Sequence, residues 1–105
     1  MIPNSYQSAA AFLSGKNRKV VRGKKATEVL RVSDNCISLY YHSTPVVTWY
    51  SDGNTVLRTG GHKSVTTKRR INQAIAGKVW QRNFEWWYTA GPYHNPEPFR
   101  EGMFA

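Results

Sequence analysis

Hydrophobic and polar residues alternate most clearly in the middle of the chain, where two strand-type segments meet at Asp52-Gly53. Asp-Gly between β-branched and aromatic segments is a strong hairpin signal, because a tight type I′ turn needs two residues with positive φ. The spacing predicts a two-residue loop in which Tyr50 pairs with Thr55 and Trp49 pairs with Val56. We therefore expect this hairpin to be the scaffold of the domain.

Strand patterns also occur before and after the hairpin. Residues 26–34 and 36–42 alternate apolar and polar positions, and the turn cluster Ser33-Asp34-Asn35 separates them. Residues 78–90 are rich in Val, Phe, Trp and Tyr. They predict a final hairpin or a long strand, with the bend at Arg82-Asn83.

Two short helices complete the predicted elements. Near the start, Ser5 is a suitable N-cap for an Ala-rich segment. Over residues 67–76 an apolar stripe has helical spacing, and Thr66 or Thr67 supplies the N-cap. Together the elements predict an α+β fold: a small antiparallel, meander-like sheet of three to five strands, one helix packed across it, and a short N-terminal helix.

The length bounds the organisation of the chain. With 105 residues we expect one domain, because two hydrophobic cores would need a longer chain. The predicted parts are an N-terminal helical segment at 1–15, a single α+β domain at 16–90 and a Pro-rich tail at 91–105. A hydrophobic content of 40% with 13% aromatic residues is that of a folded chain, so wholesale disorder is not expected.

Cysteine use and apolar runs narrow the class of protein further. Cys36 is the only cysteine, which excludes an internal disulfide and a multi-cysteine zinc site, and we expect it to be a small buried apolar residue. The longest apolar run near the start, Ala9–Leu13, is too short to span a bilayer or to form a signal-peptide core. We therefore expect a cytoplasmic protein without membrane contact.

Positive charge is unevenly distributed along the chain. The net charge is +9, with 15 Lys and Arg against 6 Asp and Glu. Residues 1–78 hold 13 basic and 3 acidic side chains, a net of +10, whereas residues 79–105 have a net of −1. A basic region with so few acids indicates a polyanionic partner, most often nucleic acid.

Residues 16–25 contain six basic side chains and no acid. The segment is either a flexible arm that follows a phosphate backbone or an edge strand whose lysines prevent pairing with another chain. The pattern favours neither alternative.

The predicted start of the second helix holds cations where the helix dipole disfavours them. Lys68, Arg69 and Arg70 would lie in the first turn, after the Gly60-Gly61 pair. Free backbone N–H groups, threonine hydroxyls and these cations together predict an anion site at the helix start. The predicted nucleic-acid-binding residues are therefore Lys16, Arg18, Lys19, Arg22, Lys24, Lys25, Lys63, Thr66, Thr67, Lys68, Arg69 and Arg70.

Aromatic side chains offer flat faces on which unpaired bases can stack. In so small a domain most of them must form the core, so we expect one or two exposed stackers, with Tyr40, Trp49 and Trp87 as the candidates. The separations of His42, His62 and His94 match no metal-ligand spacing, and the carboxylates are scattered. We expect no enzyme, no bound metal and no cofactor.

The middle of the chain resembles a family. Its pattern runs from Leu39 through His42, Thr44, Val46-Val47, Asp52-Gly53, Leu57, Gly60-Gly61, Thr66-Thr67 and Arg70-Ile71-Asn72. This resembles small uncharacterised proteins of tailed bacteriophages that carry an LxxHxT…V…DG…L…GG-aromatic…TTxxRIN pattern followed by a short β segment. The resemblance covers residues 27–88. Arg70-Ile71-Asn72 is the clearest match, and His62 stands where the family has an aromatic residue.

The resemblance implies a phage or mobile-element origin, and it brings no particular activity. With the charge pattern, it leads us to expect a non-catalytic protein that binds DNA or RNA in the host cytoplasm. The alternative is a small interaction protein that binds and inhibits a host enzyme, for instance a polymerase or a defence nuclease. A structural component of the virion is a third interpretation.

Overall fold

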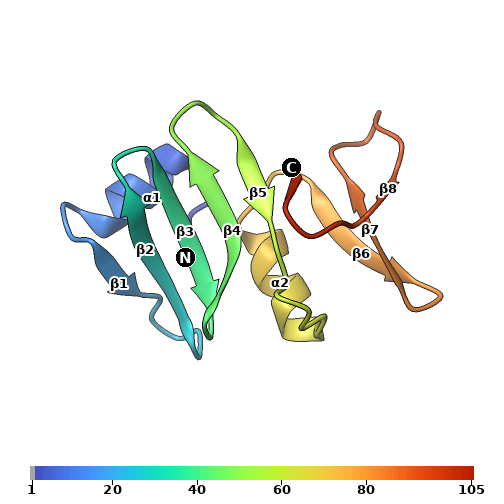
Figure 1. Ribbon diagram of the computed structural model, residues 1–105, viewed down its shortest axis with the longest axis horizontal. Helices are drawn as coiled ribbons and strands as arrows, with labels where there is room; N and C mark the ends of the chain where they lie inside the picture. Colours follow the sequence, from blue (N-terminus) through green and yellow to red (C-terminus); the bar gives the residue numbers. More distant parts are fainter. Residues whose placement is uncertain (1) are drawn as a thin grey trace.

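The computed structural model describes residues 2–105, which form two antiparallel sheets and two short helices (Figure 1). Strands hold 38% of the residues and helices 16%, so the protein is mostly β. The elements in chain order are α1 (Tyr6–Leu13), β1 (Arg18–Val20), β2 (Thr27–Ser33), β3 (Cys36–Tyr41), β4 (Thr44–Tyr50), β5 (Thr55–Leu57), α2 (Val65–Gln73), β6 (Lys78–Arg82), β7 (Glu85–Thr89), β8 (Glu97–Pro98) and β9 (Met103–Phe104).

The predicted fold class is wrong. Instead of one sheet of three to five strands with a helix across it, the chain forms a six-stranded sheet, ordered β1-β2-β3-β4-β5-β9, and a separate three-stranded sheet, ordered β6-β7-β8. The strands that the sequence pattern missed are β8 and β9, of two residues each. Such short segments lack the alternation over four or more residues on which strand prediction depends.

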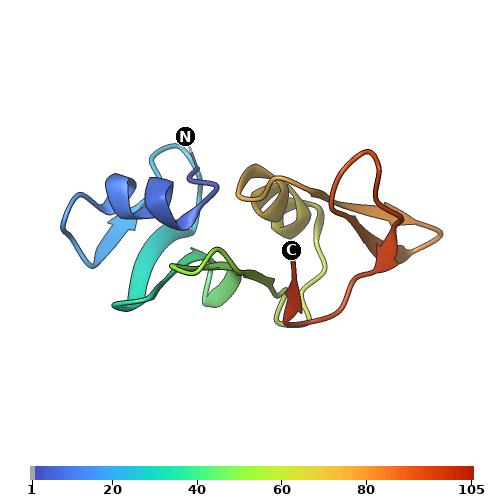
Figure 2. The ribbon, with the colours of Figure 1, turned by 90° about the horizontal axis from the view of Figure 1, so that it is seen from above.

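One face of the six-stranded sheet forms the main core. Val29, Leu39, Val47 and Leu57 lie side by side across four strands and have no exposed surface. Both helices pack on this side of the sheet (Figure 2), and Trp49 Nε1 donates a 3.1 Å hydrogen bond to the Ala74 carbonyl after α2. No helix covers the opposite face, so the larger sheet and the helices form two layers.

The central hairpin forms at Asp52-Gly53, but its predicted register is wrong by one residue. Trp49 pairs with Thr55, not with Val56. The loop contains three residues, Ser51 to Gly53, and Gly53 takes a φ of +97°, which suits a type I turn followed by a glycine bulge. The observed register places Leu57 on the helix-covered face, where its side chain is fully buried.

The basic segment 16–25 contains an edge strand. β1 is the outermost strand of the larger sheet and pairs only with β2, so of the two open alternatives the structure supports the edge strand. All three residues of β1 are exposed to solvent. Lysines and arginines on such an edge discourage pairing with a further strand.

Helix α2 connects the two sheets. The Asn72 side chain holds both backbone groups of Val79 in edge strand β6: its Nδ2 donates to the Val79 carbonyl at 2.8 Å, and its Oδ1 accepts from the Val79 N–H at 2.7 Å. On the other side α2 packs against β4 of the larger sheet. The second sheet is therefore fixed to the helix through its edge.

The C-terminal segment contributes a strand to each sheet. β8 pairs with β7, and β9 pairs with β5. Between them Phe99 and Met103 are buried, with exposed fractions of 8% and 5%. Residues 97–104 are thus an integral part of the fold. No helix within residues 2–105 is long and apolar enough to cross a membrane.

Candidate nucleic-acid interface

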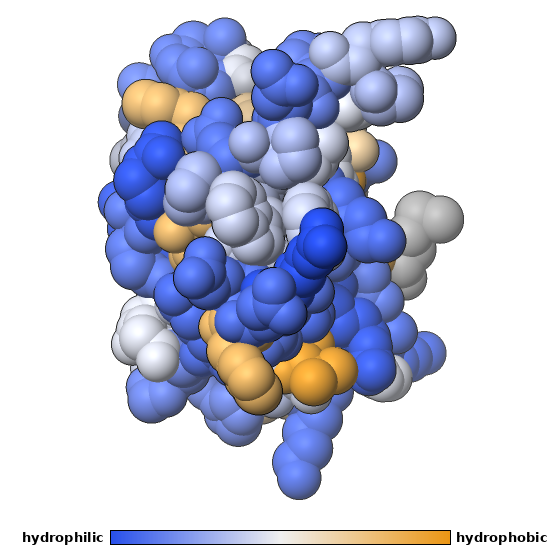
Figure 3. All heavy atoms as spheres, turned by 90° about the vertical axis from the view of Figure 1, so that its right-hand side faces the viewer, coloured by the Kyte–Doolittle hydropathy of each residue, from blue (hydrophilic) through white to orange (hydrophobic). Residues whose placement is uncertain are grey.

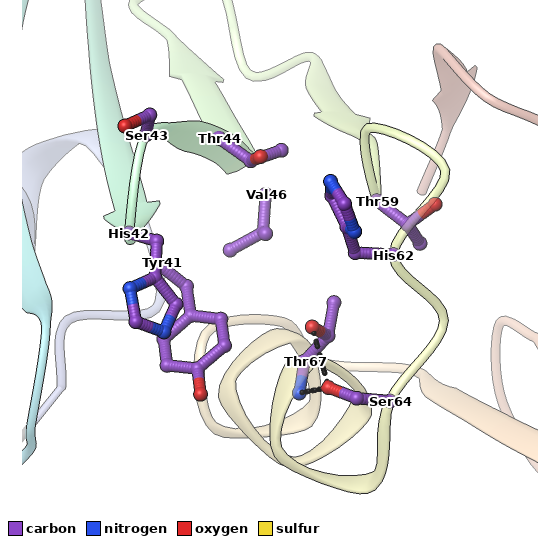
Figure 4. Close-up of a pocket in the computed structure, with 9 residues that line it drawn as sticks. All are labelled: Tyr41, His42, Ser43, Thr44, Val46, Thr59, His62, Ser64 and Thr67. Atoms are coloured by element: carbon purple, nitrogen blue, oxygen red, sulfur yellow. Dashed lines mark hydrogen bonds between the residues drawn. The ribbon is translucent and has the colours of Figure 1, made fainter.

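A pocket of about 380 Å³ lies at one edge of the larger sheet. It lies between the β3–β4 turn, the loop after β5 and the start of α2 (Figure 4). Two histidines, His42 and His62, stand on opposite sides of the opening, and side-chain hydroxyls line it between them: Ser43, Thr44, Ser64 and Thr67. We call this the histidine pocket.

His42 has a strained backbone. It begins the two-residue β3–β4 turn with a φ of +55°, a conformation that favours glycine. Its N–H donates a 2.7 Å hydrogen bond to the carbonyl of Ala26, which itself has a φ of +56°. The His42 ring packs edge-on against Tyr41, with 4.5 Å between ring centroids. These contacts hold the imidazole at the rim of the pocket.

A second hollow adjoins the histidine pocket at His42. It has a volume of about 310 Å³ and lies along the β1–β2 turn, where Lys24 and Thr27 line it. Lys24 is half-buried there, and the neighbouring Arg22 and Lys25 are exposed. The structure therefore brings cations of the segment 16–25 next to His42 and close to the opening stretch of α2.

Arg18, which lines the same hollow as Lys24, and Lys19 are engaged within the protein. Arg18 Nη2 lies 2.7 Å from Glu28 Oε2 in a salt bridge. Lys19 Nζ donates to the Phe12 carbonyl at 3.2 Å and lies 4.5 Å from the centre of the Phe12 ring. Successive residues of a strand face opposite sides of the sheet, so the six basic residues cannot form one continuous strip.

The start of α2 differs from the predicted one. Ser64, not Thr66 or Thr67, is the N-cap: its Oγ accepts from the Thr67 N–H at 3.1 Å. Lys68 is consequently the fourth residue of the helix and Arg70 lies in the last turn, where the helix dipole favours a cation. The expected conflict between the dipole and the cations does not arise.

Arg70 is a structural residue. Its side chain is 7% exposed, and its Nε donates to Thr27 Oγ1 at 3.1 Å. Its Nη1 donates to Gln73 Oε1 at 3.2 Å. Thr67 is also buried, whereas Lys63 and Arg69 are exposed. Among the cations predicted at the helix start, these two remain open to a partner.

The Gly60-Gly61 loop binds a carboxylate of the same chain, that of Glu101. The Glu101 carboxylate accepts hydrogen bonds from the Thr59 N–H at 2.8 Å, the Gly60 N–H at 3.0 Å and the Thr59 hydroxyl. Burial alone would raise the pKa of Glu101, but these hydrogen bonds and the charge of Lys63 outweigh it and lower the pKa. Of the glycine pair in the predicted anion site, the Gly60 N–H thus already binds a carboxylate of the protein.

The three predicted stacking residues lie in different environments. Trp49 is 1% exposed and belongs to the core, so it is not available to a base. Tyr40 is half-buried on the open face of the larger sheet. Trp87 is half-buried in the second sheet and stacks on Trp80, a residue that the sequence pattern did not single out.

The histidines are the residues that sequence reasoning missed. The sequence pattern placed His42 at the end of a strand, 36–42, whereas it lies in the turn between β3 and β4. Nothing local indicated that His62 would face it, because the two come together only through the packing of α2 against the sheet. Within residues 2–105 no group of three or more His, Cys, Asp or Glu side chains is arranged to hold a metal ion.

The protein is small, basic and mostly β. Its candidate site is a binding surface with hydroxyl and imidazole groups, at the sheet edge that holds the histidine pocket. The chain matches the Kyanoviridae Gp96 protein family over residues 2–105, and it belongs to that family. It is therefore a small tailed-phage protein. No curated protein and no solved structure matches the chain.

Proposed function

We propose that the chain is a non-catalytic nucleic-acid-binding protein that grips phosphates along the edge around the histidine pocket. The observation that supports this proposal is the excess of cations without a carboxylate partner. Of the 15 Lys and Arg, only Arg18 and Arg100 form salt bridges within residues 2–105, which leaves 13. Such an uncompensated surface attracts a polyanion and releases its counterions on binding.

The acidic side chains do little to offset this positive charge, because several already form salt bridges or hydrogen bonds within the protein. Glu28 and Glu97 pair with arginines, and Glu101 is held by Thr59 and Gly60. Asp52 accepts hydrogen bonds from the main chain and the side chain of Asn54 in its own turn. Little negative charge is left to repel phosphates.

The edge around the histidine pocket offers the donors that a phosphate backbone needs. Lys24 lines the hollow beside His42, and Lys63 follows His62 in the chain, with its Nζ 5.9 Å from the centre of the Phe99 ring. Between them the exposed hydroxyl of Ser43 can donate to a phosphate oxygen. These contacts carry no sequence information, so the proposed binding is general for nucleic acid.

The test is the salt dependence of binding, measured by fluorescence anisotropy with labelled oligonucleotides. The double variant Lys24→Gln/Lys63→Gln should bind more weakly and lower the slope of log K against log salt by about 2, about 1 for each lost phosphate contact. The control Lys16→Gln/Lys19→Gln removes the same charge away from the pocket and should leave the slope nearly unchanged. Equal slopes for the two double variants, or no binding by the wild type at low salt, would overturn the proposal.

We infer that the LxxHxT…DG…GG…TTxxRIN pattern is a signature of the family and that the protein acts in the cytoplasm of the infected host. The position of the pattern supports its importance, because His42, Thr44 and Thr67 all line the histidine pocket.

A second candidate function is the inhibition of a host enzyme, and one observation favours it. Phe84 is 95% exposed at the tip of the β6–β7 turn, with a φ of +67°. An aromatic side chain presented in this way is typical of an anchor residue in a protein–protein interface. Pull-down from nuclease-treated host lysate should recover one stoichiometric partner with the wild type and none with Phe84→Gly; recovery of nucleic acid alone would contradict it.

A further inference from the structure

We propose that the outer face of the second sheet binds unpaired bases of single-stranded nucleic acid, with Trp80 and Trp87 as the stacking platform. This inference rests on the proposed nucleic-acid binding and specifies its substrate class. It uses residues at the opposite end of the molecule from β1 (Figure 1).

The strand register places both tryptophans on one face. Trp80 pairs with Trp87 across β6 and β7, and Trp87 pairs in turn with Pro98 of β8. The indole rings stack with 6.0 Å between centroids and 21° between planes. The opposite face of the same sheet carries Val79, Trp86 and Tyr88, which are buried. The two faces thus differ: one belongs to the core, and the other presents a tryptophan pair.

The tryptophan pair is held in place before any ligand arrives. Trp80 Nε1 donates a 2.9 Å hydrogen bond to Thr89 Oγ1, which fixes the orientation of its ring. Both indoles are half-buried, so each keeps part of its surface in contact with water. Rigid aromatic rings of this kind bind at a low cost in conformational entropy.

A broad hollow of about 760 Å³ lies beside Trp80. Its floor is made by small residues, Ala76, Gly77 and Gly91, together with Pro92. The volume falls within the range of about 300–1,000 Å³ that is usual for ligand sites. A base that stacks at the edge of the tryptophan pair therefore has space for its ring and its sugar.

Two cations and one carboxylate flank the platform: Lys78, Arg82 and, opposite Arg82 across the turn, Glu85. Lys78 and Arg82 stand at the two ends of β6 on the same face as Trp80, and both are exposed without a salt bridge. Arg69, also exposed, lies one helical turn before Asn72, which lines the hollow. Figure 3 shows this end of the molecule, where hydrophilic side chains surround a group of weakly polar residues. Aromatic rings interleaved with cations match a strand of phosphates and bases.

This chemistry selects single strands. In a duplex the faces of the bases are covered by their neighbours in the stack, so an aromatic platform can reach them only after unstacking, which costs a few kcal/mol. A single strand presents these faces freely. The open face of the larger sheet is a weaker candidate, because its centre is a hydrogen-bonded hydroxyl pair, Ser38 and Thr48, at 2.7 Å, and no stacked aromatic pair lies on it.

The experiment compares labelled oligothymidylate and oligouridylate of about 12 nucleotides, within the usual site size of about 4–16, with a labelled blunt-ended DNA duplex. Trp87→Leu should bind the single strands about five- to tenfold more weakly, as expected when one stacked base is lost, and the duplex unchanged. Trp87→Phe, which keeps an aromatic face, should restore most of the affinity. The control Phe104→Leu removes an exposed aromatic ring from the other sheet and should change neither.

A second measurement does not depend on a variant. Trp49 and Trp86 are buried, so quenching of tryptophan fluorescence in the wild type by a single strand, and much less by the duplex, would report contact with Trp80 and Trp87. Tighter binding of either single strand supports the inference and identifies the nucleic acid. If the wild type binds neither type of probe, the proposed function fails. If single strand and duplex bind equally and Trp87→Leu has no effect, the proposed function stands and this inference is overturned.

Discussion

Asn83 and Phe84, the two residues of the β6–β7 turn, both have positive φ, +52° and +67°. A tight hairpin turn of this kind matches the twist of its strands, and glycine is the preferred second residue. Asn tolerates the left-handed region, whereas a bulky residue with a Cβ is destabilised there by about 1–2 kcal/mol. The chain thus keeps an exposed phenylalanine where glycine would be more stable, which indicates a role other than folding.

Replacement of Phe84 by glycine should therefore stabilise the protein by about 1 kcal/mol, because the strain disappears and no buried contact is lost. Urea unfolding followed by circular dichroism would measure the change. Asn83→Gly is the matched control, and it should have a smaller effect. A destabilised Phe84→Gly variant would show that the phenylalanine makes contacts that stabilise the turn.

Glu101 stabilises the Gly60 loop only in its charged form. The pKa of Glu101 is lowered in the folded protein. Its contribution to the stability of the fold is therefore fully present above the ordinary carboxyl pKa of about 4.5. That contribution is lost as the pH falls through the lower pKa of the folded state. Glu101→Gln should cost about 1 kcal/mol at pH 7, as expected for charge-assisted hydrogen bonds that water partly screens.

Unfolding of the wild type and of Glu101→Gln at pH 7 and at pH 3 provides the test. The difference in free energy of unfolding should be smaller at pH 3 than at pH 7, because pH 3 lies below the ordinary carboxyl pKa, where the stabilisation that comes with the lowered pKa begins to be lost. A difference that is the same at both pH values would contradict the role assigned to the charge.

At the scale of elements, the sequence predicted most strands and helices, and failed at their ends and in their assembly. β2, β3 and β4 lie where alternation and turn residues placed them, and the β6–β7 hairpin turns at Asn83-Phe84, one residue after the predicted bend at Arg82-Asn83. The register error at Asp52-Gly53 arose because a two-residue and a three-residue loop share the same Asp-Gly signal, and only the burial of Leu57 distinguishes them.

The candidate site was less predictable than the strands. The cations Lys24 and Lys63 were expected from charge alone, and both remain accessible. The histidine pocket, the Glu101 contact and the Trp80–Trp87 stack each join residues distant in sequence or across a hairpin, so they depend on packing that no local pattern encodes. The contact of Glu101 with the Gly60 N–H could not be predicted for the same reason, because this carboxylate comes from the C-terminal segment.

Gly77 fixes how closely the segment after α2 approaches β7. A Cβ at this position would lie 2.6 Å from the Thr89 carbonyl oxygen and 2.8 Å from Tyr88 Oη. Gly77→Ala should therefore destabilise the protein by about 1–3 kcal/mol, because a backbone atom cannot move aside as a flexible side chain can.

Gly91→Ala is the matched control, since its Cβ would meet only the His94 ring, at 3.3 Å, and that side chain can turn away. Thermal unfolding of both variants measures the difference. Equal melting temperatures for the two would show that the contact at Gly77 relaxes without cost.

At the scale of the whole molecule, two sheets share one small core. The protein measures 41 × 28 × 20 Å, and its long axis runs from the larger sheet to the second one (Figure 1). The proposed phosphate-binding edge lies on the larger sheet, and the tryptophan platform lies on the second sheet. A single strand bound at both would span most of the long axis, so its affinity would depend on the length of the oligonucleotide.

The pairing of β5 with β9 has a consequence for the order of events during synthesis. Met103, the partner of Leu57, follows it by 46 residues. Translation proceeds at about 5–20 residues per second, so β5 remains an open edge for several seconds while the helix and the second sheet are made. During that interval its unpaired backbone can accept a strand from another nascent chain, and the arrival of β9 ends the exposure.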